Sequence, residues 1–126
     1  MAGEGWLEVR VVPGKGRGVF LRAAVAAGTV LESAPALELD AEDLARLEGT
    51  VVEDYQFAHP EDPERGCLIF GLASLLNHSD QPNVELRWEK RERAGWFVSM
   101  VALVDLPAGV ELLYRYRCPP WFPVVE

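Results

Sequence analysis

The sequence predicts a single domain built mainly from β-strands, and three observations support this fold class. Short apolar segments with alternating polar positions recur along the whole chain. Clusters of glycine, proline and aspartate separate them at a regular spacing, which favours a β-rich fold over alternating βα units. Only one segment combines a helical pattern with caps at both ends. A length of 126 residues fits one domain.

The N-terminal third predicts strands joined by glycine-containing turns. Apolar side chains at positions 7, 9 and 11 alternate with charged ones, so residues 6–12 are expected to form a strand with one buried face. A glycine-spaced segment follows at 14–20. The triplet Ala27-Gly28-Thr29 predicts a turn into a strand that begins at residue 30.

The middle of the chain contains the best helix candidate, from Asp40 to Leu47. Asp40 can cap its first turn, Asp43 lies three residues further on, and Gly49 can end it. Residues 59–66, with two prolines and four charges, predict an exposed loop. Residues 71–76 predict a helical turn.

The C-terminal part predicts three strands. Residues 84–89 alternate as a half-buried strand, and residues 96–104 are apolar enough for a strand buried on both faces. After a turn at 105–109, residues 110–117 return as a strand. Its period of two places four side chains on one face, namely Val110, Leu112, Tyr114 and Tyr116.

Composition narrows the classes of protein to which the chain can belong. The net charge of −8 argues against a nucleic-acid-binding protein and is compatible with a basic partner such as a lysine-rich tail. No apolar run approaches the ~20 residues of a membrane span, and the first residues lack the pattern of a signal peptide. We therefore expect a soluble intracellular protein, either cytoplasmic or nuclear and chromatin-associated.

The two cysteines, Cys67 and Cys118, lack the spacing of metal ligands, and no metal is expected. Reduced thiols are the plainer interpretation, and a disulfide between them stays open.

The glycine-spaced segment Gly14-Lys15-Gly16-Arg17-Gly18-Val19-Phe20 has two interpretations. A dinucleotide-binding fingerprint needs a third glycine where Val19 stands, and no Gly-Lys-Ser/Thr follows as in a phosphate-binding loop. The segment alone favours a hairpin turn. Alternatively, the absence of Cβ atoms lets the backbone approach a ligand closely.

Asn77-His78-Ser79 closes the apolar run 67–76 and leads into the polar turn Asp80-Gln81-Pro82-Asn83. Polar side chains placed there usually cap a structural element or line a pocket. Asn77 can end a helical turn, and His78 can be a hydrogen-bonded core histidine.

The glycine-spaced segment, the Asn77-His78-Ser79 motif with Pro82-Asn83, and the C-terminal segment Gly109 to Tyr116 occur in the order that the SET domain family shows. The chain resembles its small single-domain members from about residue 7 to residue 116, with a tail at 117–126. The resemblance implies a fold of several short sheets, few short helices and a knot-like C-terminal threading. It also implies S-adenosyl-L-methionine as cofactor.

The resemblance implies roles for particular residues. The segment Gly16-Arg17-Gly18 would hold the methionine end of the cofactor, Asn77 its amino-acid end, and the His78 backbone its adenine. Tyr116, which aligns with the tyrosine closing the family's C-terminal motif, would be the catalytic residue.

Three further aromatic residues have weaker assignments. Tyr114 would line the substrate channel or be a half-buried strand residue. Tyr55 would line the same channel, although a core or surface tyrosine explains it better. Trp121 would cover the adenine, wall the lysine channel or anchor the tail.

The function implied is transfer of a methyl group from S-adenosylmethionine to lysine side chains of a basic protein or peptide. This chain differs from the family's C-terminal motif at three positions, namely Val110, Leu113 and Arg115. They favour an alternative, a SET-like module that binds a basic peptide without turnover. A purely structural β-rich domain is the third hypothesis.

Overall fold

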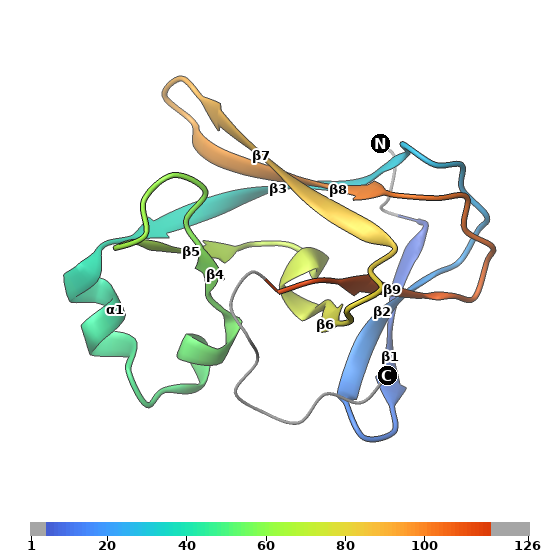
Figure 1. Cartoon of the computed structure of the whole chain (residues 1–126), viewed down its shortest axis with the longest axis horizontal. Coiled ribbons are helices and arrows are strands. Elements are labelled where there is room, and N and C mark those ends of the chain that lie inside the picture. Colours follow the sequence, from blue (N-terminus) through green and yellow to red (C-terminus); the bar gives the residue numbers. More distant parts are fainter. Residues whose placement is uncertain (1–4, 117–126) are drawn as a thin grey trace.

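The computed structural model describes residues 5–116, which form two β-sheets with few short helices. The mainly β fold class expected from the sequence is confirmed. The strand order is β1-β2-β9-β6 in one sheet and β4-β5-β3-β8-β7 in the other. Figure 1 shows α1 at the left end of the molecule and the β1–β2 hairpin at its lower right.

The first sheet joins both ends of the described chain. Strands β1 (Leu7–Val12) and β2 (Gly16–Leu21) form an antiparallel hairpin, and Gly14 and Gly16 adopt φ of 82° in or beside its turn. Such a φ strongly favours glycine, so the hairpin interpretation of this segment is confirmed. Strand β9 (Glu111–Tyr114) lies between β2, to which it is antiparallel, and β6 (Asn77–His78), to which it is parallel.

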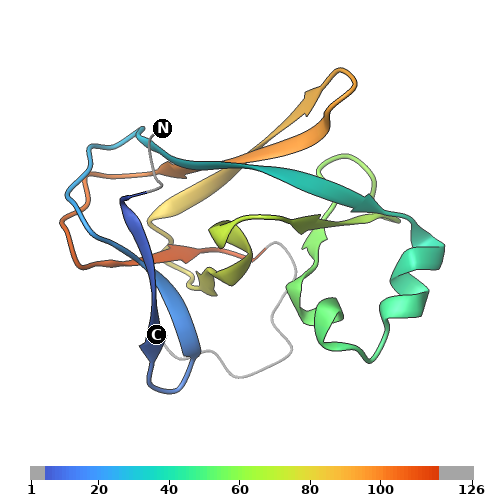
Figure 2. The same ribbon diagram turned by 180° about the vertical axis from the view of Figure 1, so that it is seen from behind.

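The second sheet is formed by the middle of the chain. The ten-residue strand β3 (Val30–Leu39) pairs with β5 (Gly66–Ile69) on one side and β8 (Gly95–Ala102) on the other. The outer strands are β4 (Phe57–Ala58) and β7 (Val84–Arg91). The β7–β8 hairpin projects beyond the rest of the molecule in Figures 1 and 2.

Helix α1 (Ala41–Leu47) begins where the sequence predicts. Asp40 Oδ1 accepts the Asp43 N–H at 2.8 Å, and the Asp40 N–H donates to Asp43 Oδ2 at 3.2 Å, which together form a capping box. The predicted helical turn is the 3₁₀ helix η2 (Leu72–Leu75). A second one, η1 (Val51–Tyr55), has no apolar periodicity and was not expected.

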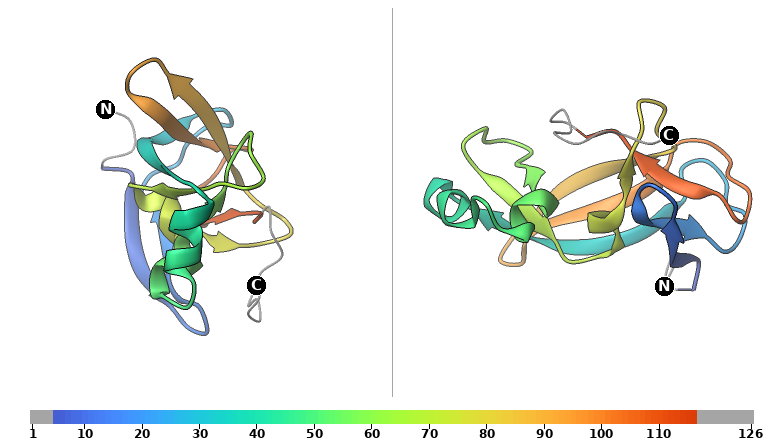
Figure 3. Two further views of the ribbon diagram at one scale, coloured as in Figure 1. Left: turned by 90° about the vertical axis from the view of Figure 1, so that its left-hand side faces the viewer. Right: turned by 90° about the horizontal axis from the view of Figure 1, so that it is seen from below.

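One hydrophobic core lies between the elements and takes side chains from both sheets and from η2. Its largest fully buried side chains are Leu21, Leu31, Met100, Leu112, Val19, Val84 and Val98. Helix α1 contributes no buried residue. It lies at one end of the molecule, as the right-hand view of Figure 3 shows. The core therefore holds β6 and β9 in place, whereas α1 and η1 form a separate exposed end.

Three expectations from the sequence were wrong in detail. The segment 59–66 is not wholly exposed, because His59 and Gly66 are buried at its two ends. Strand β8 alternates between partly buried and buried residues up to Met100, and only its last residues, Met100 to Ala102, are buried without alternation. Phe97 and Ser99 are only partly buried, and the strand ends before the exposed Leu103 and Val104. The last strand stops at Tyr114, so Tyr116 lies beyond its end.

Within residues 5–116, no helix is long and apolar enough to cross a membrane. The part of the expected C-terminal threading that concerns 117–126 lies outside the described residues, as do Trp121 and Cys118.

Candidate active site

Strand β6 places the Asn77-His78 motif beside the C-terminal strand. Asn77 pairs with Leu113 and His78 with Tyr114 in parallel register, and the Ser79 N–H donates to the Tyr114 carbonyl at 3.1 Å. The apolar residues before the motif, Ala73 and Leu76, are buried in the core. The motif is therefore fixed at the edge of the core, with its side chains directed at neighbouring segments.

The Asn77 side chain connects three parts of the chain that are distant in sequence. Its Nδ2 donates to the Arg17 carbonyl oxygen at 2.9 Å and to Glu111 Oε2 at 2.7 Å. Asn77 thus joins the glycine-spaced segment, the motif and the C-terminal strand at one point.

Gly18 lies against this junction. A Cβ added to Gly18 would lie 2.4 Å from Glu111 Oε2 and 2.9 Å from Asn77 Nδ2, closer than atoms can approach. Gly16 is different, because a Cβ there would meet nothing within 4 Å. Gly18 is therefore needed for close approach, and Gly16 for its backbone conformation.

Asn83 ties β9 to the turn that follows the motif. Its Nδ2 donates to the Glu111 carbonyl at 2.9 Å, and its Oδ1 accepts the Leu113 N–H at 2.7 Å. Both bonds reach backbone atoms of β9. The Leu113 side chain takes no part in either bond. The difference from the SET family motif at position 113 therefore leaves both bonds in place.

Tyr116 is held by the segment 76–78 at two of its atoms. Its backbone N–H donates to His78 Nδ1 at 2.9 Å, and its hydroxyl donates to the Leu76 carbonyl at 3.1 Å. The His78 and Tyr116 rings also pack with centroids 4.9 Å apart. The same segment that carries Asn77 therefore fixes the backbone, ring and hydroxyl of Tyr116.

The hydrogen bond from Tyr116 determines the tautomer of His78. Since Nδ1 accepts a hydrogen bond, the ring proton lies on Nε2, which faces Asp80 Oδ1 at 3.2 Å. His78 is buried, at 8% exposed, so the interpretation as a hydrogen-bonded core histidine is confirmed for its side chain.

The Tyr116 phenol is stabilised in its neutral form. Burial raises the pKa of Tyr116 above its ordinary value of 10.0, and the nearby Tyr55 phenol adds to the rise. At neutral pH the Tyr116 hydroxyl consequently keeps its proton, which is directed at the Leu76 carbonyl. The neutral phenol can therefore form hydrogen bonds but does not act as a base.

Further aromatic rings surround Tyr116. The rings of Tyr114 and Tyr116 lie 5.9 Å apart, and Phe57 packs against Tyr114 at 6.0 Å. Tyr114 is buried, whereas Tyr55 at the end of η1 is 36% exposed. The two tyrosines assigned to a substrate channel thus lie on the Tyr116 side of the molecule, one in the core and one at its surface.

The structure brings most of the predicted site residues together. The contacts of Asn77, His78 and their neighbours connect Arg17, Gly18 and Tyr116, whereas Gly16 only shapes the hairpin.

Sequence reasoning missed two contributors to this junction, Glu111 and Lys15, and gave Asn83 no role. The positions of Glu111 and Asn83 within recognised motifs were the only signal available.

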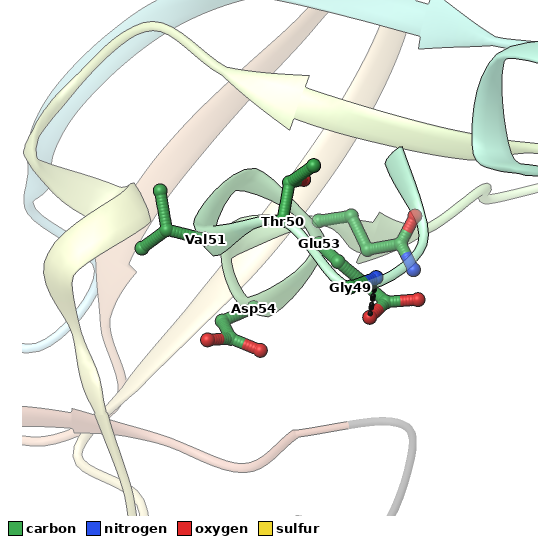
Figure 4. A pocket seen from close by; sticks show the side chains of 6 residues that line it. Gly49, Thr50, Val51, Glu53 and Asp54 are labelled. Atoms are coloured by element: carbon green, nitrogen blue, oxygen red, sulfur yellow. Dashed lines mark hydrogen bonds between the residues drawn. The ribbon is translucent and has the colours of Figure 1, made fainter. Parts of the chain in front are cut away.

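An open pocket of about 590 Å³ lies elsewhere, along η1 and the turn before it (Figure 4). Figure 4 shows Glu53 turned back to the Gly49 N–H, to which its Oε1 bonds at 3.1 Å. This pocket does not include the residues around Tyr116. Its lining residues are Gly49, Thr50, Val51, Glu53, Asp54 and Gln56.

Two further groups of side chains within residues 5–116 concern metal binding and thiol chemistry. No three His, Cys, Asp or Glu side chains of this part of the chain are grouped as metal ligands. Cys67 is a buried free thiol, and burial raises its pKa from 9.0 to about 11, so it stays protonated at neutral pH.

Comparison with known proteins identifies a family and a fold. The family model of the SET domain matches residues 16–117. A histone-lysine N-methyltransferase of Schizosaccharomyces pombe, named as specific for lysine 37 of histone H3, is 32% identical over 117 residues. These cover 92% of this chain and 76% of that protein.

A crystal structure of a Plasmodium falciparum protein described as a histone methyltransferase shares the fold. The TM-score is 0.73 at 22% identity, over 93% of this chain and 97% of that one. The family match includes Gly16-Arg17-Gly18, Asn77-His78 and the C-terminal tyrosines. The resemblance noted in the sequence is thereby confirmed, and the chain belongs to the SET domain family.

Proposed function

We propose that this protein is an S-adenosylmethionine-dependent methyltransferase that acts on lysine side chains of a basic protein or peptide. Membership of the SET domain family and the relative named as a histone-lysine N-methyltransferase support the reaction class. One observation carries the proposal. The three-residue segment 76–78 contains Asn77, which bonds to Arg17, and its other two residues accept hydrogen bonds from the Tyr116 N–H and hydroxyl.

The residues around Asn77 fit the amino-acid end of the cofactor. An α-ammonium group needs hydrogen-bond acceptors, and Asn77 Oδ1 can serve as one because the Nδ2 atom of the same side chain is bound to Arg17 and Glu111. The absence of a Cβ at Gly18 keeps the backbone of β2 close to both side chains. When bound, S-adenosylmethionine supplies a methyl group activated by its sulfonium centre.

Tyr116 orients the reacting groups instead of moving a proton. Its pKa is raised by burial, so its phenol remains neutral, and its lone pairs can accept a hydrogen bond from an amine. Because His78 and Leu76 fix its position, this acceptor is preorganised. Alignment of reactants in this way can contribute ~7–11 kcal/mol to a reaction barrier.

The substrate lysine must be neutral to act as a nucleophile, although its reference pKa is ~10.4. The rings of Phe57, Tyr114 and Tyr116 form apolar walls that lower this pKa by desolvating the ammonium. Their faces also tolerate the positive charge of the methylated product. The net charge of −8 attracts a basic partner at long range.

The direct test is calorimetric titration with S-adenosylmethionine, followed by incubation with labelled cofactor and a lysine-rich peptide. We expect binding by the wild type and label on the peptide. Tyr116→Phe should bind the cofactor within about threefold of wild type but lose about 100-fold in transfer, because only the oriented oxygen is removed. Absence of cofactor binding by the wild type would refute the proposal.

A second function, peptide binding without turnover, is favoured by the departures at Val110, Leu113 and Arg115. The labelled-peptide assay separates the two, since a binding module would retain the peptide and leave it unlabelled. The chain has only two lysines, Lys15 and Lys90, so label on the protein itself can be located by mass spectrometry.

A further inference from the structure

Glu111 occupies the centre of the junction between the glycine-spaced segment, Asn77 and β9. Its backbone pairs with Phe20 of β2, and its two carboxylate oxygens have different partners. Oε2 accepts from Asn77 Nδ2 at 2.7 Å, and Oε1 lies 3.4 Å from Lys15 Nζ. The side chains of Glu111 and Lys15 are only 15% and 11% exposed.

These contacts determine which way the Asn77 carboxamide points. Both groups that face Asn77 Nδ2, the Arg17 carbonyl and the Glu111 carboxylate, are acceptors without a hydrogen to donate. A carboxamide turned by 180° would place its oxygen against two acceptors. Oδ1 is therefore directed away from them, and it has no hydrogen-bond donor within residues 5–116.

We propose that Glu111 is a positioning residue, which holds the Asn77 carboxamide so that Oδ1 faces the ammonium group of the methyl donor. The part that concerns the donor rests on the proposed function. The part that concerns the carboxamide rests on the geometry alone. Glu111 thus acts through Asn77.

The ion pair with Lys15 indicates how Glu111 acts on Asn77. Lys15 is held in an ion pair with the carboxylate oxygen that does not contact Asn77, so the charge of Glu111 is largely balanced within the protein. Glu111 therefore contributes mainly by accepting a hydrogen bond and less by attracting the donor's ammonium. A neutral side chain of the same shape should consequently replace it well.

The first test compares two substitutions at Glu111 by calorimetric titration with S-adenosylmethionine. Glu111→Ala removes the acceptor and should weaken binding about 10- to 100-fold, the range expected for a hydrogen bond to a charged group. Glu111→Gln keeps an oxygen for Asn77 and should stay within about fivefold of wild type. Glu85→Ala, which removes an exposed carboxylate of β7 paired with Arg87, is the matched control.

A double-mutant cycle distinguishes positioning from general structural support. Once Asn77→Ala is present, adding Glu111→Ala should weaken binding by less than about twofold more, because no carboxamide is left to orient. Additive losses would overturn the proposal, as would wild-type affinity in Glu111→Ala.

A second measurement needs no cofactor. In the free protein, the two side-chain amide hydrogens of Asn77 should exchange slowly with solvent and have distinct NMR shifts. Glu111→Ala should speed their exchange at least about tenfold, whereas Glu85→Ala should not. Unchanged exchange would overturn the proposal. If the exchange changes but the wild type binds no S-adenosylmethionine, the holding of Asn77 stands and the proposed function fails.

Gly18→Ala tests the same contact without removing either polar group. The new methyl group would displace the Glu111 carboxylate from Asn77, so we expect a binding loss similar to that of Glu111→Ala. Gly5→Ala is its control, because a Cβ there meets nothing within 4 Å. Wild-type affinity in Gly18→Ala would overturn the proposal.

Discussion

His59 and His78 lie in different parts of the molecule and use their imidazole rings in the same way. They are 7% and 8% exposed. The Nδ1 atom of each ring accepts backbone N–H bonds, and each Nε2 faces a carboxylate. Each ring also packs against an aromatic side chain, which is Trp96 for His59 and Tyr116 for His78.

The two rings differ in how far along the chain their bonds reach. His59 accepts from Glu61 and Asp62, two and three residues later, at 3.1 and 3.0 Å, and so closes its own loop. His78 accepts from Tyr116, 38 residues away, and so holds together two motifs. The comparison shows that the same local chemistry stabilises a loop in one place and positions a proposed catalytic group in the other.

The largest expected difference between the two histidines is in methyl transfer. His78→Ala should lower kcat/KM about 10- to 100-fold, because the Tyr116 N–H loses its acceptor and its ring loses a packing partner. His59→Ala should stay within about threefold of wild type. Steady-state assays with labelled cofactor measure both.

His78→Asn is the informative control, because its side-chain oxygen can take the place of Nδ1 and should restore part of the rate. Equal losses in His59→Ala and His78→Ala would remove the distinction between a loop-closing and a positioning histidine.

The same difference in range explains which parts of the fold could be predicted from sequence. Helix α1 was found because its signals, Asp40, Asp43 and Gly49, lie within ten residues of one another. The burial of His59 was missed because its carboxylate partner, Glu38, lies on another strand. The apolar content of residues 96–104 predicts burial on both faces, but the face of β8 that carries Phe97 and Ser99 is covered only in part.

The candidate site followed from motif recognition and not from local patterns. Asn77 and Tyr116 were identified in this way, and the structure brings them to one segment. Glu111 was missed because its contacts are with Asn77 and Lys15, which are 34 and 96 residues away. Sequence spacing carries no information about such pairs.

For stability we expect the opposite order, with a larger loss in the free energy of unfolding for His59→Ala than for His78→Ala. His59→Ala leaves the N–H groups of Glu61 and Asp62 without their acceptor and separates Glu38 from its partner, so we expect a loss of about 1–3 kcal/mol in the free energy of unfolding. His78→Ala, which leaves one N–H without its acceptor, should cost less. Urea unfolding followed by circular dichroism measures both, and a larger loss in His78→Ala would contradict the prediction.

The smallest expected effect is a pH dependence confined to the His59 region. The hydrogen bond from His59 lowers the pKa of Glu38 below its ordinary value of 4.5, and the charges of His59, Arg65 and Lys90 act in the same direction. Because the folded state prefers the ionised carboxylate, this contribution to stability is present above about pH 4.5 and is lost as the pH falls below it.

Glu38→Gln should therefore flatten the fall in stability between neutral pH and about pH 3, measured by urea unfolding at a series of pH values. Glu89→Gln, which changes an exposed carboxylate of β7 paired with Arg91, should leave the slope unchanged. An identical slope in wild type and Glu38→Gln would mean that the His59–Glu38 bond does not select the ionised form of Glu38. His59 would then close its loop through Nδ1 alone, which is the atom that His78 uses to hold Tyr116.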